Sequence, residues 1–284
     1  MRPLGQKYWL QVALGAFCVL CPGLTVSTRA DTVTFTITAD SFSTTIYAIT
    51  AGQAPVNDVF TVGINVHITQ YNGQPKILNL LEFCHEMAEP ITPGPTYVHD
   101  VVPAREIGVY SAGDPGSEGY GIPAGGIGDL RAARLSYLMD THYKGTSASD
   151  WTRTDAEPDT IAFQLAVWET THDTDLSLAF NPGAPAGTSM WIDAANINNS
   201  SVARRANAIT LAQSYLDDVA AASVPSTYTS INWDVLGLID DGDQDLAIAT
   251  AKGALVPVPE PASLLIVSTG LALLLGRRRR SAKC

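Results

Sequence analysis

Cys84 and Gln164 are the two residues of this sequence whose side chains could react with each other. Cys84 is the only cysteine between residues 31 and 257. If the segment around Gln164 is helical, Gln164 lies three residues after Ile161 and four before Trp168, so its carboxamide points toward the same apolar face. A buried amide without partners costs about 1–3 kcal/mol. Either backbone hydrogen bonds satisfy this amide or a reaction consumes it.

The reaction open to such a pair is formation of an internal thioester. A thiolate attacks the glutamine carboxamide and ammonia leaves, provided that the two side chains are held in contact and shielded from water. The product is an activated acyl group, ready for transfer to an amine or a hydroxyl. The alternative is a non-reactive structural protein of the extracellular matrix or the envelope. In that case Cys84 is an unreacted buried thiol and Gln164 is hydrogen-bonded.

Two short motifs around these residues resemble bacterial surface thioester domains. Phe83-Cys84 resembles their aromatic-Cys motif, and residues 164–168, Gln-Leu-Ala-Val-Trp, resemble their Gln-x-Ala-Ile-Trp motif. Those domains occur on Gram-positive adhesins, bind host molecules or surfaces covalently, and fold as a β-sandwich or barrel with a helical part. The resemblance implies a bond between Cys84 and Gln164, with Phe83 and Trp168 packed around it. Phe163 stands where those adhesins usually have Thr.

The elements that must position this pair fall into β, helical and β stretches. Apolar residues alternate with polar ones in several early segments, whereas later segments show helical spacing. We therefore predict an α+β fold, a β-sandwich or barrel with an inserted helical subdomain. Strands are expected within 31–110 (33–37, 44–50, 60–68, 76–87, 97–102) and 225–252 (228–235, 246–251), and helices within 126–222 (127–143, 158–169, 202–219).

Both ends of the chain are interpreted as targeting segments. Residues 1–30 have a basic start, an apolar stretch and small residues before Ala30, which is typical of a signal peptide. Residues 258–284 resemble the PEP-CTERM sorting tail of Gram-negative bacteria, which implies recognition by an exosortase-type membrane protease. The tail combines a sorting motif, a short apolar segment at 262–276 and a cytoplasmic basic anchor, formed by Val258, Pro259, Glu260 and Pro261 and by Arg277, Arg278, Arg279 and Arg280.

The charge of the remaining domain, residues 31–257, limits its partners. It contains 9 basic and 27 acidic residues, a net charge of −18. Such a surface repels nucleic acid and favours solubility. We expect a protein that crosses the inner membrane, is transiently anchored there by its apolar tail segment, and then reaches the cell surface or the extracellular space. Its expected partner is a nucleophile on a surface, polysaccharide or protein; neither enzymatic turnover nor a cofactor is predicted.

Three other groups of residues were weighed as sites. Cys84 could act with a histidine (His99, His142 or His172) as in a cysteine protease, but no family signature surrounds it. The acidic segment 240–245 could bind calcium, although it lacks the Glu that closes an EF-hand loop. The polar run that includes Glu169, Asp173 and Asp175 is interpreted as the exit from a helix. No metal site is predicted.

Overall fold

The computed structural model divides the chain into two units, Met1–Ala30 and Asp31–Cys284. Everything described below belongs to the second unit. The predicted signal peptide and sorting tail lie outside the described residues. These residues are 31–38, 45–50, 56–60, 63–85, 93–108, 125–147, 150–151, 159–173, 175–179, 190–192, 202–240 and 243–255.

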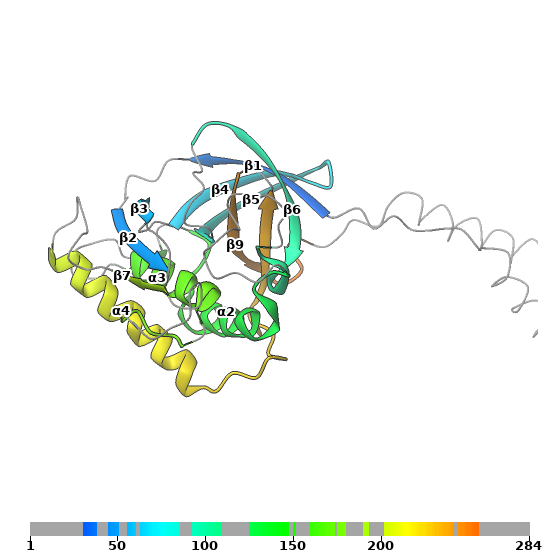
Figure 1. The fold of residues 1–284 in the computed structure, drawn as a ribbon. Coiled ribbons are helices and arrows are strands. Elements are labelled where there is room, and N and C mark those ends of the chain that lie inside the picture. Colours follow the sequence, from blue (N-terminus) through cyan, green and yellow to red (C-terminus); the bar gives the residue numbers. More distant parts are fainter. Residues whose placement is uncertain are drawn as a thin grey trace, which may run out of the picture. The chain divides into compact units, whose positions relative to one another are not determined.

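Six antiparallel strands form a closed barrel (Figure 1). Its order is β1-β4-β5-β9-β8-β6, and pairing of β1 with β6 closes it. The barrel resolves the choice between sandwich and barrel that the sequence left open. Its strands are β1 (Asp31–Thr38), β4 (Gly63–Tyr71), β5 (Gln74–Cys84), β6 (Thr96–Pro103), β8 (Trp233–Asp240) and β9 (Asp243–Ala251).

A second, three-stranded sheet corrects two expectations. It has the order β3-β2-β7, with β2 (Thr45–Thr50), β3 (Val56–Phe60) and β7 (Met190–Ile192). We expected one strand over 60–68, but β3 ends at Phe60 and β4 begins at Gly63, and the two belong to different sheets. An alternating pattern that continues across the break gives no sign that the chain changes sheets. We did not predict β7, which lies inside the expected helical part.

The tight turn between β4 and β5 was visible in the sequence. Asn72 and Gly73 adopt positive φ angles of 51° and 70°. Asparagine and glycine tolerate this left-handed conformation, and two such residues in succession form the turn that suits the twist of a hairpin. The turn fixes the register in which β5 runs from Gln74 to Cys84 along β4.

Three helices account for the predicted helical part. They are α2 (Gly128–His142), α3 (Asp159–His172) and α4 (Val202–Ala221), and a short 3₁₀ helix, η1 (Ala104–Glu106), follows β6. α3 contacts β4, β5, α2 and α4, so it lies between the barrel and α4 (Figure 1). All fourteen residues of α3 are buried. Within it, residues 161–168 are apolar except for Gln164, as expected of a helical stretch surrounded by other elements.

No helix in the described part of the chain is both long and apolar enough to cross a bilayer. The predicted apolar segment 262–276 is outside that part.

Candidate functional site

Cys84 is the last residue of β5, where that strand runs between β4 and β9. Phe83 pairs with Gly63 of β4 on one side and with Ala247 of β9 on the other. Cys84 itself pairs with Leu246 of β9, and the His85 N–H donates to the Asp245 carbonyl at 2.9 Å. In the described residues the β4 register ends at Gly63. The backbone of Cys84 therefore depends on a partner outside β4.

Gln164 of α3 supplies this partner. Its Oε1 accepts a hydrogen bond from the Cys84 N–H at 2.9 Å, and its Nε2 donates to the Cys84 carbonyl at 2.7 Å. The side-chain amide thus bonds the two backbone groups of one residue, as a neighbouring strand does in a hydrogen-bonded antiparallel pair. Cys84 is 4 % exposed and Gln164 is 0 % exposed. The two residues predicted to react are in contact, and the buried amide has the backbone partners that the alternative interpretation required.

A cluster of aromatic rings packs beside this contact. The Phe83 ring lies 4.7 Å from that of Phe163, so two successive residues of β5 meet two successive residues of α3. Trp151 and Tyr143 extend the cluster, with ring centroids 5.4 and 6.3 Å from that of Phe83. Phe163, which departs from the Thr of the adhesin motif, is fully buried here and fills the space beside Gln164. Water is excluded from this side of the pair.

Trp168 follows Gln164 by one turn of α3 and is also fully buried. The backbone carbonyl of Trp168 lies 3.0 Å from Nδ1 of His172, whereas its indole Nε1 has no hydrogen-bond partner among the described residues. Trp168 therefore lies on the buried helix next to the pair, in line with a packing role.

The titratable groups nearest in sequence to Cys84 are held uncharged by burial. Burial raises the pKa of Glu82 well above its usual value. Burial, together with the charges of His172 and Arg131, lowers the pKa of His85 well below its usual value. The pKa of His172 is lowered to about 4, chiefly by burial. At neutral pH both imidazoles are therefore neutral, and burial disfavours the charged form of Glu82.

The Cys84 N–H donates to the oxygen that would take up charge if a nucleophile attacked the Gln164 carboxamide. A nucleophile that adds there places negative charge on Oε1, and the Cys84 N–H already donates to that atom. A fixed donor in a site closed to water stabilises such a charge far more than a donor in solvent does. The same two hydrogen bonds also join the barrel strand β5 to α3, which is a purely structural role.

The remaining candidate residues lie in other parts of the fold. His99 packs inside the barrel against Phe35, with ring centroids 4.9 Å apart. His142 lies in α2 and pairs with Asp218 of α4 at 3.3 Å. In the segment 240–245, the Asp240 N–H donates to Asp245 at 3.1 Å, and residues 241–242 are outside the described residues. The sorting motif and the basic anchor, at 258–261 and 277–280, also lie outside them.

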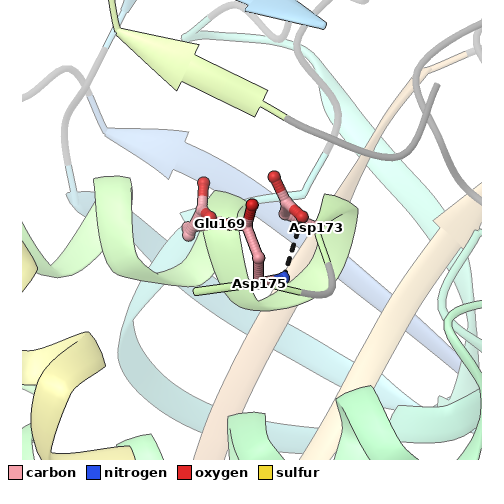
Figure 2. Close-up of side chains that lie close together, drawn as sticks. All are labelled: Glu169, Asp173 and Asp175. Carbon is pink, nitrogen blue, oxygen red and sulfur yellow. Dashed lines mark hydrogen bonds between the residues drawn. The ribbon is translucent and has the colours of Figure 1, made fainter. Parts of the chain in front are cut away.

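Sequence reasoning missed an acidic cluster at the end of α3. Figure 2 shows Glu169, Asp173 and Asp175 together, with ligand oxygens within 4.8 Å of one another. α3 does end at His172, as the helix-exit interpretation requires, but the polar run also brings three carboxyl groups to one place. The alternation of oxygen-bearing residues at Asp173, Asp175 and Ser177 is the signal that could have revealed it.

Comparison with known proteins gives one structural match. No family model and no curated protein matches the sequence. Among solved structures, the N-terminal domain of the Streptococcus pyogenes pilus tip adhesin Cpa is similar over 76 % of this chain and 98 % of that one. The identity is 11 % and the TM-score 0.37. A likeness of this extent carries no inference about function.

Proposed function

We propose that this chain is an exported surface protein in which Cys84 and Gln164 form an internal thioester. The thioester captures one nucleophile, an amine or a hydroxyl on a neighbouring surface or matrix polymer, in a single covalent event without turnover. The observation that carries the proposal is the buried contact in which the Gln164 carboxamide meets Cys84 through two hydrogen bonds, of 2.9 and 2.7 Å.

The proposed reaction balances without any added group. The sulfur of Cys84 bonds to the carboxamide carbon of Gln164, and the electron pair of the carbonyl moves onto Oε1, where the Cys84 N–H donates. The bond from that carbon to Nε2 then breaks, and Nε2 leaves as ammonia after taking up the thiol proton. In the second step a partner amine or hydroxyl bonds to the same carbon, the carbon–sulfur bond breaks, and the proton lost by the nucleophile passes to the sulfur, which restores Cys84 as a thiol.

Exclusion of water is the second support for this proposal. A thioester exposed to bulk water hydrolyses, so the pair must react in a closed site. Gln164 is fully buried, Phe83 and Phe163 pack beside the contact, and burial disfavours the charged forms of Glu82 and His85. This packing limits the access of water to the acyl group.

A structural role is the second candidate, and one observation favours it. The two hydrogen bonds satisfy both ends of the Gln164 amide, so this side chain is already stable without reacting. In that case the contact only locks α3 to β5. The protein would then be an inert component of the envelope or the matrix.

The intact mass of the exported protein separates the two candidates. A thioester lowers the mass by one ammonia, and methylamine then adds once at Gln164. Cys84→Ala should abolish both effects. A matched control is Gln213→Ala, because Gln213 also bonds a backbone N–H and a backbone carbonyl, at 3.1 Å each, but pairs with no cysteine. A full, unreactive mass in the unaltered protein would leave only the structural role.

For the tail we propose processing by an exosortase-type protease, after which the domain stays at the surface or is released. The support for this is the order of segments in residues 258–280: the Val-Pro-Glu-Pro motif, then the apolar stretch, then four arginines. Export in a strain that lacks the protease, followed by mass determination of the C-terminus, tests it independently of the thioester.

A further inference from the structure

The C-terminal end of α3 gathers three carboxyl groups. Glu169 lies in the last turn of the helix, and Asp173 and Asp175 follow it in the segment that leaves the helix (Figure 2). Their ligand oxygens all lie within 4.8 Å of one another. Glu169 and Asp173 are buried, whereas Asp175 is exposed. Access from solvent to the cluster is therefore through Asp175.

Glu169 gives a separate indication that something is bound there. Its side chain is 0 % exposed, and neither carboxyl oxygen has a hydrogen-bond partner within the part of the chain that the structure describes. Burial, followed by the charges of Asp173 and Asp175, raises its pKa well above the usual value. The Ser177 N–H opposes this rise but donates its own hydrogen bond to Asp175 Oδ1 at 3.0 Å. A carboxyl group buried in this way needs a cation or a proton.

A cationic side chain of α2 also meets this cluster. Arg131 interacts electrostatically with Asp173 and donates to the Thr171 carbonyl at 3.1 Å. A bound divalent cation would add positive charge beside the carboxyl groups, and so favour the ionised form of the buried Glu169.

We propose that Glu169, Asp173 and Asp175 form a calcium site. Three carboxylates make an all-oxygen set, which hard cations prefer to nitrogen and sulfur ligands. Two oxygens on one Ca²⁺ lie at most about 5 Å apart, because each bond is about 2.3–2.6 Å long. The spread of 4.8 Å satisfies this limit, whereas Mg²⁺ requires oxygens within about 4 Å in a strict octahedron.

The site ties the end of α3 to α4. The Asp175 N–H donates to Asp173 Oδ1 at 3.0 Å. In the residues that follow, Gln213 of α4 forms hydrogen bonds with the Leu176 carbonyl and the Leu178 N–H. A cation shared by Glu169 and Asp175 fixes this segment to the helix as well. This inference does not depend on the thioester, because none of its ligands takes part in that reaction.

Calorimetric titration of the full exported chain, stripped with a chelator and titrated with CaCl2, tests the proposal. We expect one bound calcium ion and a rise in Tm on calcium addition. Glu169→Gln should weaken calcium binding about tenfold or more, because ligand charge sets affinity in such sites. Glu82→Gln is the matched control, since Glu82 is equally buried and without a hydrogen-bond partner but has no acidic neighbour that shifts its pKa.

Each outcome decides for or against the site. Calcium binding by the unaltered protein and by Glu82→Gln, but not by Glu169→Gln, supports it. Should Glu169→Gln fail to fold, Asp175→Asn, at an exposed position, must show the same weakening. No heat of binding up to millimolar calcium, or unchanged binding by both Glu169→Gln and Asp175→Asn, overturns the proposal; the second result places the ion elsewhere, as at 240–245.

Discussion

Two glutamine side chains of this protein hold a backbone segment in a similar way, yet their surroundings differ. Gln164 bonds the N–H and the carbonyl of Cys84, and Gln213 bonds the N–H of Leu178 and the carbonyl of Leu176. The first contact is buried and joins a barrel strand to a helix. The second is part-buried, and Nε2 of Gln213 also donates a hydrogen bond to the Asp217 carboxylate at 2.9 Å. A glutamine that makes two backbone hydrogen bonds is thus an ordinary structural feature. Of these two contacts, only the Gln164 contact involves a cysteine and is fully buried.

Loss of the Gln164 amide should have the largest effect on stability. Gln164→Ala leaves the buried N–H and carbonyl of Cys84 without these partners and creates a cavity between α3 and β5. We expect the free energy of unfolding to fall by about 3 kcal/mol or more. Urea denaturation followed by circular dichroism measures it. If this variant is as stable as the unaltered protein, the contact does not hold the two layers together.

The neutral state of the buried His172 should be visible as a pH effect on stability. Burial lowers its pKa from 6.5 to about 4, so between these values the unfolded chain binds a proton that the folded chain does not. Stability is therefore lost as the pH falls through this window, by about 1.4 kcal/mol per pH unit for one group.

His172→Gln should remove this part of the slope. The charge of His172 also lowers the pKa of His85, so the difference between the two stability profiles reports His172 together with its effect on His85. Parallel profiles from pH 6.5 to 4 would mean that His172 is protonated in the folded state.

The aromatic cluster should contribute less than the Gln164 hydrogen bonds. Phe163→Leu keeps an apolar side chain of similar size but loses the ring contacts with Phe83, Trp151 and Tyr143. We expect a loss of about 1 kcal/mol. A thioester in this variant should also hydrolyse faster, because the ring packs beside the bond. Thermal denaturation and the time course of water addition by mass spectrometry measure these two effects.

The Gln213 contact should give the smallest change. Gln213→Ala removes hydrogen bonds in a part-buried, solvent-accessible setting, where water replaces the lost partners. We expect a loss of about 1 kcal/mol or less. The same denaturation assay used for Gln164→Ala measures it. Equal losses for the two variants would remove the distinction between the buried and the part-buried contact.

The sequence contained enough to predict the element types but not how the strands assemble. Helical spacing located the three helices, and Asn72-Gly73 located the hairpin turn. Closure of the barrel depends on pairing of β1 with β6, and the second sheet on pairing of β2 with β7. Such long-range pairings leave no local pattern, which is why the break after Phe60 and the strand at 190–192 were missed.

The site was predictable in part for a similar reason. A single cysteine and an inward amide are visible as residue types, and the structure brings Cys84 and Gln164 together. The hydrogen bonds from the Gln164 amide to the Cys84 backbone could not be predicted from the sequence, because they depend on where the pairing of β4 with β5 ends. The cluster at Glu169 was missed because a polar run after a helix is usually solvated, whereas Glu169 is buried by elements distant in sequence.

The separation of Cys84 and Gln164 by 80 residues has a consequence for the life of the molecule. β5 and α3 must both be formed and docked before sulfur and carbonyl carbon can meet, so an unfolded chain passing through a translocation pore cannot carry the bond. If the proposed thioester forms, the release of ammonia marks the moment at which each molecule completes its fold. Mass spectrometry at successive times after synthesis would date this event.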